Sequence, residues 1–322
     1  MSSEEVMSLL GTGEWVSGEE IASRLGVSRA AVWKRIEGLR TKGYKIDACT
    51  RRGYRLSKNQ DLLDAGLIRS GLKTRWLGKD LRCYGEVEST NETARSIART
   101  TQNGTVLVAE TQAKGRGRLS RSWASPSGGV WMTLILKPEI PLAEAHRINM
   151  AVSVALAKAI RSLYSLEAGI KWPNDLLIGD RKICGILMEV SAEVDRLDYA
   201  LVGVGINANV DVSGFPSEWK ATSLSRELGR DVSRSELIQR ILQEIEEAYG
   251  MMNSREIYEE WRSLSLTLGR RVRIISAAGE LVSYAAELAE DGALLLKTEK
   301  GMRRVLAGDC IHLRAEPWRG LT

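Results

Sequence analysis

The 322-residue sequence has few of the residues that mark disulfide-rich, zinc-binding or membrane proteins. It contains four cysteines with no C-x-x-C pair, and its two histidines, His146 and His312, lie far apart in the chain. These shortages disfavour a disulfide framework and a structural zinc site. The longest apolar stretches, such as Val130 to Leu136, are strand-sized, and the first residues lack the basic start and apolar run of an export signal. We therefore expect no transmembrane span, no membrane partner and a cytoplasmic location.

Charge is spread unevenly along the chain. The net charge is +5, yet the segment from Arg24 to Lys58 holds eleven Lys and Arg residues against only Glu37 and Asp47, so this segment carries +9 and the remainder −4. The length and the apolar share of 43% predict an ordinary globular protein of two or three domains, at about 150 residues each. The basic surface that meets a partner is therefore predicted to be N-terminal.

That basic segment has the pattern of three helices and a hairpin. Two S-x-x-E capping boxes open the first two helices, Ser2 with Glu5 and Ser17 with Glu20. Leu25-Gly26-Val27 then predicts a tight break, and Ser28 caps a third helix. The apolar residues of the third helix occur at helical spacing, namely Val32, Trp33, Ile36 and Leu39. Residues from Tyr44 to Leu56 predict a two-stranded wing with Gly53 at its tip.

The order of these elements resembles a winged helix-turn-helix, which places its third helix in the major groove of DNA and its wing along the backbone. We expect Lys34 and Arg35 to hold phosphates, and Ser28 and Arg29, at the start of the third helix, to reach base edges. The full set predicted to bind DNA is Ser28, Arg29, Lys34, Arg35, Arg51 and Arg52. A basic face that is only solvated surface is the alternative, but here the turn and the wing accompany the charge.

Beyond Lys58 the pattern changes to a linker with a short helix, followed by alternating strands and helices. Strands are predicted at 105–110, 130–136, 183–190 and 199–206, and a helix at 148–163. A second helix is predicted from the capping box of Ser233 and Glu236, followed by the stripe Leu237, Ile241, Ile245 and Met252. This alternation indicates an α/β or α+β domain.

The most informative stretch of that domain lacks carboxylates. No acidic residue occurs between Glu110 and Glu139. Within eight positions the stretch places Lys114, Gly115, Arg116, Gly117, Arg118 and Arg121. Glycines let backbone amides approach an anion, and guanidinium groups pair with phosphate or carboxylate oxygens, so the loop is suited to polyphosphate. The spacing of a Walker loop is missing, and taken alone the stretch fits a plain surface loop equally well.

This loop begins a series of four blocks. In chain order they are Gly115-Arg-Gly-Arg-Leu-Ser-Arg-Ser-Trp-Ala-Ser-Pro-Ser-Gly-Gly129, Lys171-Trp-Pro-Asn-Asp175, Arg181-Lys-Ile-Cys-Gly185 and Gly203-Val-Gly-Ile-Asn-Ala-Asn209. Together they closely resemble the biotin protein ligases, and with the winged helix in front the whole chain resembles the bifunctional biotin ligases and biotin operon repressors. The resemblance implies an α+β multidomain fold: a winged helix-turn-helix domain (1–60), a linker (61–80), a central α/β ligase domain of the class II synthetase-like and lipoate ligase type (81–266), and an SH3-like β barrel (267–322).

The resemblance implies a two-step acyl transfer. Biotin and Mg-ATP give biotinyl-5′-AMP, and a lysine of the biotin carboxyl carrier domain of acetyl-CoA carboxylase then displaces AMP and forms an amide. The adenylate is also expected to act as corepressor and to favour a homodimer, which brings two winged helices to a two-part operator DNA. No dedicated protein ligands for a metal are expected, because Mg²⁺ would arrive with ATP.

The resemblance also assigns roles to single residues. Lys182 matches the lysine between the biotin carboxylate and the α-phosphate, Asp175 a carboxylate that orients the acceptor amine, and Arg116 and Arg118 complete the catalytic set. The biotin-binding set is Ser89, Thr90, Asn91, Gln112, Gly115, Arg116, Gly117, Arg118, Trp123, Lys182 and Gly185. The ATP-binding set is Arg118, Arg121, Trp123, Lys171 and Asn207, with Gly203 and Gly205 allowing close approach of the backbone, and one late arginine, either Arg314 or Arg319. Without the resemblance, Ser89-Thr90-Asn91 would indicate only a helix cap and Trp-Pro-Asn-Asp only a turn.

Three other interpretations stay open. A lipoate ligase or octanoyl transferase would share the central fold and the acyl chemistry, although those proteins lack the combination of Gly-Arg-Gly-Arg with Lys-Trp-Pro-Asn-Asp. A pure transcription factor that senses biotin would need no phosphate-binding residues. A ligase whose N-terminal domain no longer represses transcription would keep the whole pattern.

Overall fold

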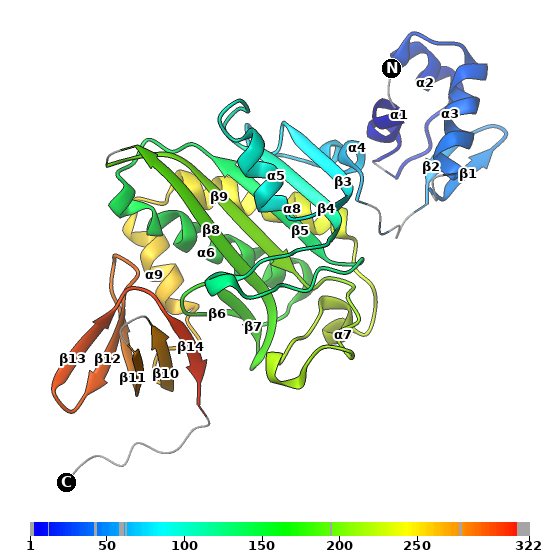
Figure 1. The fold of residues 1–322 in the computed structure, drawn as a ribbon. Helices are drawn as coiled ribbons and strands as arrows, with labels where there is room; N and C mark the ends of the chain where they lie inside the picture. The colour runs from blue at the N-terminus through cyan, green and yellow to red at the C-terminus, as the bar shows by residue number, and fades with distance from the viewer. Residues whose placement is uncertain are drawn as a thin grey trace.

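The computed structural model describes residues 3–11, 13–41, 44–57, 61, 63–193, 195–276 and 279–313. It shows an N-terminal helical unit with a hairpin, a central sheet with helices, and a small C-terminal sheet (Figure 1). The N-terminal unit and the C-terminal sheet lie at opposite ends of the central sheet. The predicted α+β multidomain fold is confirmed.

The N-terminal unit folds around a core of its own. Apolar side chains of α1 (Ser3–Leu10), α2 (Gly18–Leu25) and α3 (Arg29–Thr41) pack with those of the hairpin formed by β1 (Ile46–Cys49) and β2 (Gly53–Leu56). The hydroxyl of Ser17 caps α2 by accepting from the amide of Glu20 at 3.0 Å, and Gly26 ends the helix with a φ of 63°. These local signals in the sequence correctly predicted where α2 begins and ends.

Trp33 departs from the apolar stripe predicted for α3. Val32, Ile36 and Leu39 are at most 1% exposed, and each contributes about 1.5–3 kcal/mol of burial energy. Trp33, in contrast, is 58% exposed. The three buried residues lie within an arc of about 60° around the helix, whereas Trp33 is turned by about 100° from Val32 and falls outside that arc. Trp33, which the sequence analysis included in the apolar stripe, therefore lies outside the core.

The segment predicted as a linker is docked on both of its neighbours. Its helix α4 (Ala65–Ser70) packs against α1 and against α8 (Arg234–Gly250). The side-chain amide of Gln239 in α8 donates to the carbonyl oxygens of Leu67 and Ile68 at 3.1 and 3.0 Å. Asp61 pairs with the buried Arg234 at 2.5 Å. The N-terminal unit is therefore attached to the central unit by specific contacts.

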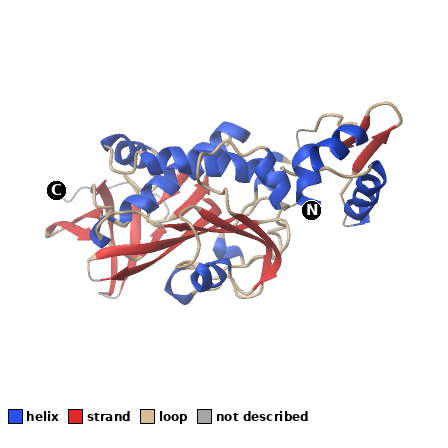
Figure 2. Ribbon diagram, turned by 90° about the horizontal axis from the view of Figure 1, so that it is seen from above, coloured by secondary structure: helices blue, strands red, loops and turns tan. Residues whose placement is uncertain are grey.

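The central unit is a seven-stranded sheet in the order β3-β4-β5-β9-β8-β7-β6, in which β3 and β4 pair in parallel and the other neighbours antiparallel. A layer of helices covers one face (Figure 2), formed by α6 (His146–Tyr164) and α8 with α9 (Arg255–Ser263) packed on α6. Helix α5 (Thr90–Ile97) packs on the opposite face. The strands are β3 (Leu81–Val87), β4 (Thr105–Gln112), β5 (Val130–Leu136), β6 (Ala168–Lys171), β7 (Asp175–Ile178), β8 (Arg181–Glu193) and β9 (Arg196–Ile206).

The C-terminal unit is a five-stranded antiparallel sheet in the order β13-β12-β11-β10-β14. Its apolar side chains are continuous with the main core, and the indole nitrogen of Trp172 in the β6–β7 turn donates to the carbonyl of Gly292 at 2.9 Å. These contacts bring β14 close to the central sheet. The strands are β10 (Arg271–Ser276), β11 (Gly279–Leu288), β12 (Leu294–Thr298), β13 (Gly301–Val305) and β14 (Asp309–His312).

Candidate active site and basic N-terminal face

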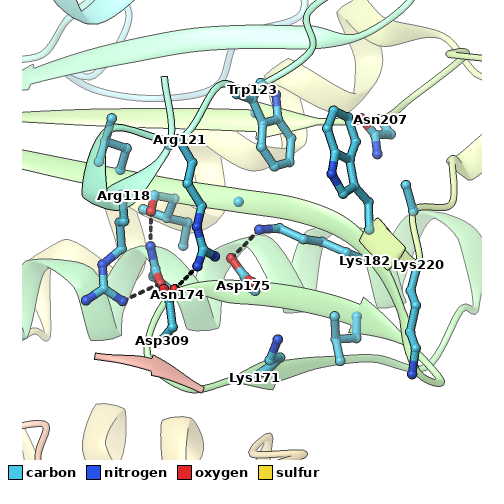
Figure 3. A pocket seen from close by; sticks show the side chains of 18 of the residues that line it. Arg118, Arg121, Trp123, Lys171, Asn174, Asp175, Lys182, Asn207, Lys220 and Asp309 are labelled. Carbon is cyan, nitrogen blue, oxygen red and sulfur yellow. Dashed lines mark hydrogen bonds and ion pairs between the residues drawn. The ribbon is translucent and has the colours of Figure 1, made fainter. Parts of the chain in front are cut away.

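The structure brings most of the predicted ligand-binding residues around one cavity of about 490 Å³ on the α5 side of the central sheet (Figure 3). That volume lies within the usual range for small-molecule sites. The wall is formed by the start of α5, the loop between β4 and β5, the β6–β7 turn, parts of β8 and β9, the loop before α7 (Leu224–Leu228), and β14. Among the described residues predicted to bind biotin or ATP, Gly115 alone lies off the wall, tightly packed against Trp123 and Ser125. Arg314 and Arg319 lie outside the described residues.

Buried polar side chains form a hydrogen-bonded network at the α5 end of the cavity. The side-chain oxygen of Gln112 accepts from the amide of Thr90 at 2.8 Å. The hydroxyl of Thr133 in β5 donates to Asn91 Oδ1 at 2.6 Å, and Asn91 Nδ2 donates to Glu189 Oε2 at 2.7 Å. Each polar group in this network is thereby held in one orientation before any ligand enters.

Apart from Asp309 Oδ2, which is ion-paired with Arg121, two buried polar atoms on the cavity wall have no hydrogen-bond partner in the part of the chain that the structure describes. They are Trp123 Nε1 and Asn207 Oδ1. The amide nitrogen of Asn207 is already engaged, because Nδ2 donates to the carbonyl of Thr222 at 3.0 Å. Ser89, which the sequence alone indicates as the cap of α5, makes no side-chain cap hydrogen bond although it is 2% exposed. A buried unpaired group costs about 1–3 kcal/mol, so Trp123 Nε1 and Asn207 Oδ1 indicate where a ligand would complete the site.

Gly203 and Gly205 make room for two of these side chains. A Cβ atom at Gly203 would lie 2.4 Å from Asn91 Oδ1, and one at Gly205 would lie 2.6 Å from Trp123 Nε1. From the sequence analysis, we expect the nucleotide to approach the backbone at these glycines. In the structure, the side chains of Asn91 and Trp123 lie against them.

Lys182 and Asp175 meet in the middle of the cavity (Figure 3). Lys182 Nζ lies 2.7 Å from Asp175 Oδ1 and 5.0 Å from the centre of the Trp123 ring. The two charged side chains are 28% and 20% exposed, so water screens this ion pair less than one on the surface. The arrangement holds an ammonium group in place between a carboxylate and an aromatic face.

A β-bulge places Lys182 on the same side of the sheet as Asp175. Asp175 of β7 pairs with Gly185 of β8, and an unbroken register would then pair Leu177 with Ile183. In the structure Leu177 pairs with Lys182 instead, so Ile183 is the extra residue. Because side chains alternate between the faces of a sheet, this one-residue shift turns Lys182 toward the cavity.

Each arginine of the glycine-rich loop is held by a different element. Arg116 pairs with Glu92 of α5 at 2.5 Å. Arg118 donates to Asn174 Oδ1 at 3.1 Å and to the carbonyl of Gly308 at 3.3 Å, and Arg121 pairs with Asp309 of β14. Burial lowers the pKa of Arg118, against the attraction of Asp309 and Asp175. The loop therefore links α5, the β6–β7 turn and the C-terminal sheet.

Several residues on the wall were not predicted from the sequence. The loop before α7 contributes an edge-to-face aromatic pair with ring centres 5.5 Å apart, and its backbone accepts from the amide of Lys182 at 2.7 Å. The strand β14 contributes an acid that binds the arginine loop. Asn174 lies inside the Lys171–Asp175 block, but the resemblance assigns it no role. The unpredicted residues include Asn174, Phe215, Trp219, Lys220, Asp309 and His312.

His312 is located where the C-terminal sheet meets the cavity. Its Nε2 lies 3.0 Å from the hydroxyl of Thr267, and that hydroxyl accepts from the amide of Trp172 at 2.9 Å. Burial, and then the charges of Lys171 and Arg270, lower the pKa of His312 to about 4. The imidazole is therefore neutral at physiological pH.

Within the described ranges, no three or more His, Cys, Asp or Glu side chains are close enough to hold a metal ion. Nor does that part of the chain contain a helix of the length and apolar character needed to cross a membrane. The four cysteines are unpaired, and burial raises the pKa of Cys310 to about 12. Its thiol is therefore unreactive at neutral pH.

The residues predicted to bind DNA lie on the N-terminal unit. Ser28 caps α3, its hydroxyl accepting from the amide of Ala31 at 3.2 Å. Arg29 and Lys34 are exposed on α3, Arg51 and Arg52 are exposed at the turn between β1 and β2, and Arg35 is half-buried. Over the described residues, no ion pair joins the four exposed cations to an acidic side chain.

Known proteins share this organisation. The family model for the biotin/lipoate A/B protein ligase family matches residues 84–207, that for a helix-turn-helix domain residues 3–55, and that for the biotin protein ligase C-terminal domain residues 267–313. The bifunctional ligase/repressor BirA of Bacillus subtilis is 40% identical over 303 residues, which cover 92% of this chain and 93% of that protein. The biotin–[acetyl-CoA-carboxylase] ligase of Mycobacterium tuberculosis is 30% identical over 80% of this chain and 99% of its own.

A solved structure gives the same result in three dimensions. The biotin protein ligase from Aquifex aeolicus, in complex with biotin and ATP, matches with a TM-score of 0.64 and 31% identity over 74% of this chain and 100% of that chain. The chain therefore belongs to the biotin protein ligase family, among the members with a helix-turn-helix domain in front of the ligase domain.

Proposed function

We propose that this protein makes biotinyl-5′-AMP from biotin and ATP, transfers the biotinyl group to a lysine of a biotin carboxyl carrier domain, and represses a biotin operon when the adenylate is bound. The observation that carries the proposal is the Lys182–Asp175 pair, 2.7 Å apart in a cavity bordered by three arginines of one loop. Such a site suits a reaction between two anions.

The first step needs positive charge more than it needs an acid or a base. A carboxylate oxygen of biotin attacks the α-phosphorus of ATP, and the bond from that phosphorus to the bridging oxygen of pyrophosphate breaks. In this proposal Lys182 binds both the carboxylate and the α-phosphate, and Arg118 and Arg121 neutralise the pyrophosphate. Mg²⁺ bound to the nucleotide would supply further neutralisation. To bind phosphate, Arg121 would exchange its contact with Asp309 for phosphate oxygens.

The second step needs a neutral amine. The acceptor lysine attacks the carbonyl carbon of the mixed anhydride, the bond from that carbon to the phosphate oxygen breaks, and AMP leaves. One oxygen of Asp175 accepts from Lys182, and the other can accept from the incoming ammonium group and orient it. The ammonium releases one proton before attack and the new amide nitrogen releases a second. Both protons pass to solvent, and Asp175 acts by orienting the amine.

The polar atoms on the cavity wall support places for the two substrates. The network of Thr90, Asn91 and Gln112 fits the donors and acceptors of a ureido ring, with Ser89 adding a hydroxyl. The unpaired Oδ1 of Asn207 fits the amino group of adenine, which is a hydrogen-bond donor. The Trp123 ring faces Lys182 Nζ. This position, between the ureido end and the adenine end of the cavity, fits the bond that joins biotin to the α-phosphate.

For the repressor activity we propose a homodimer that forms when the adenylate is bound and presents two N-terminal units to a two-part operator. The exposed cations of α3 and of the wing support DNA as the partner. We retain residues 1–60, 61–80, 81–266 and 267–322 as the proposed domains, with the segment 61–80 docked by α4 and not freely mobile.

The test of the ligase activity uses the full-length protein with biotin, ATP, Mg²⁺ and a purified carboxyl carrier domain, and measures the mass of that domain. The expected result is the addition of one biotinyl group, and none on a carrier whose acceptor lysine is replaced by arginine. Parallel reactions with lipoate and octanoate separate the related ligases. A carrier that stays unmodified with biotin but gains lipoate or octanoate would refute the proposal.

The test of the repressor activity is footprinting on the DNA upstream of biotin-synthesis genes, with and without biotin plus ATP at fixed protein concentration. Protection is expected only with both substrates, together with a shift from monomer to dimer in sedimentation. Equal protection under both conditions would show that operator binding does not depend on the adenylate.

A further inference from the structure

The exposed Trp33 is the feature of the N-terminal unit that the proposed function leaves unexplained. Among the described residues up to 57, it is the one large apolar side chain in the exposed class, with 58% of its surface accessible. A tryptophan presents about 150–250 Å² of largely apolar surface, so water contacts a sizeable apolar area there. The rest of the apolar stripe of α3 is buried, so core packing does not explain the tryptophan at this position.

The neighbours of Trp33 indicate a partner that is anionic. Arg29 lies one turn before it on the same side of α3, and Lys34 follows it on the exposed face; neither has an ion pair within the described part of the chain. Glu37, one turn after Trp33, is paired with Arg40 at 2.7 Å. The field around the indole ring is therefore positive, which favours a nucleic acid over a neutral or basic protein surface.

The shape of this face leaves room for base edges. Ala30 is small and exposed, and Gly38 is exposed with no side chain or backbone within 4 Å of where its Cβ would be. An α-helix fits into the major groove, where the apolar group on display is the C5-methyl of thymine. Ser28, Arg29 and Trp33 occupy the first half of α3, the part of a recognition helix that contacts bases.

We propose that Trp33 reads thymine in the operator by packing its indole ring against the C5-methyl group in the major groove. This proposal rests on the proposed repressor function and adds a specificity residue to it. Side chains four apart on a helix are about 5–6 Å apart, and successive bases of a strand about 3.4 Å, so the thymine lies one or two base pairs from the position read by Arg29. The phosphate contacts of the wing supply affinity, and Trp33 supplies selectivity.

The experiment first defines the operator. Full-length protein with biotin and ATP is used to select duplexes from a random library, and the enriched sequence is determined. Each thymine of that duplex is then replaced singly by deoxyuridine, which removes the methyl and changes no hydrogen-bonding group. Dissociation constants are measured by fluorescence anisotropy for the wild type, Trp33→Ala and, as the matched control from the same helix, Arg29→Ala.

For the wild type, loss of the methyl that Trp33 contacts should weaken binding about fourfold, and about fifteenfold when both half-sites of a dimer are changed. Trp33→Ala should bind the thymine duplex more weakly and be indifferent to deoxyuridine at that one position. Arg29→Ala should bind more weakly yet keep the full deoxyuridine effect. Because Trp33 is exposed, its replacement should leave the melting temperature unchanged.

Other outcomes overturn the proposal in distinguishable ways. If wild type and Trp33→Ala lose the same factor with deoxyuridine at every position, Trp33 does not read thymine, and the repressor function is untouched. If Trp33→Ala weakens dimerisation in sedimentation and shows no coupling to any methyl, the indole is a protein contact. If the wild type enriches no sequence at all, the repressor function itself fails.

Discussion

The cavity and the basic N-terminal face use positive charge in opposite ways. In the cavity, Lys182 is paired with Asp175, and Arg118 donates to Asn174. On the N-terminal face, Arg29 and Arg51 are exposed and form no ion pair with any described residue. The first arrangement fixes where each charge lies, whereas the second leaves the charges hydrated and adjustable.

This difference follows from what each region has to bind. Positioned charges that do not reorganise during a reaction lower its barrier most effectively. A DNA backbone offers a row of similar phosphates, so cations that contact it need number and exposure more than fixed orientation. We therefore expect substitutions in the cavity to change rates by large factors, and substitutions on the basic face to change mainly the dependence of binding on salt.

The largest effect is expected for Lys182→Ala. Removing the ammonium leaves Asp175 as an uncompensated carboxylate beside two anionic substrates, so adenylation should fall by about 10²–10³-fold. Biotin-dependent pyrophosphate exchange measures this step directly. The matched control is Lys158→Ala on α6, whose lysine pairs with Glu260 at 3.4 Å away from the cavity and should leave exchange unchanged. Near-normal exchange by Lys182→Ala would remove this residue from the mechanism.

A smaller and more selective effect is expected for Asp175→Ala. If its carboxylate orients the acceptor amine, transfer from preformed biotinyl-5′-AMP should slow by about 10²-fold, while adenylation is affected less. Pyrophosphate exchange and single-turnover transfer to the carrier domain measure the two steps separately. Equal losses in both steps would show that Asp175 serves only to hold Lys182.

The sequence predicted the membership of the cavity better than its internal contacts. Lys182 and Asp175 lie in recognisable blocks, but their ion pair depends on the bulge at Ile183, for which the local sequence has no marker. Arg121 and Asp309 are far apart in the chain, and only the packing of the C-terminal sheet against the β6–β7 turn brings them together.

The fold was predicted where local signals are strong. Helix α2 begins after the cap Ser17 and ends at Gly26, as the types of these two residues indicate. The exposure of Trp33 was not predicted, because a run of apolar residues in a helix does not show which of two neighbours, Val32 or Trp33, is buried. The packing of the other elements against α3 decides it. The loop before α7 has no periodicity or motif, so its place on the cavity wall was not predictable from the chain alone.

A moderate effect is expected from the pH dependence of stability. The pKa of His312 is about 4 in the folded protein against an ordinary value of 6.5, so the unfolded chain takes up a proton at a pH where the folded chain does not. The free energy of unfolding should therefore fall as the pH drops from 6.5 to 4, by on the order of 2 kcal/mol from this residue, and level off below. Urea titrations of the wild type and His312→Asn across this range measure it. Parallel curves for the two proteins would show that burial does not hold His312 neutral.

The smallest effect is expected for single substitutions in the wing, and it tests whether the exposed cations of the N-terminal face contact DNA phosphates. Each of Arg51→Ala and Arg52→Ala should remove about one phosphate contact and reduce the slope of log K against log salt concentration by about 0.9. The matched control is Arg24→Ala, because that arginine belongs to the same unit but is already paired with Glu20 at 2.7 Å. Binding to the operator duplex at several salt concentrations gives the slopes. Arg24→Ala could instead lower the slope as much as the wing variants do. In that case an existing ion pair would not keep a cation from contacting DNA. The difference between paired and unpaired cations would then not explain how the cavity and the N-terminal face differ.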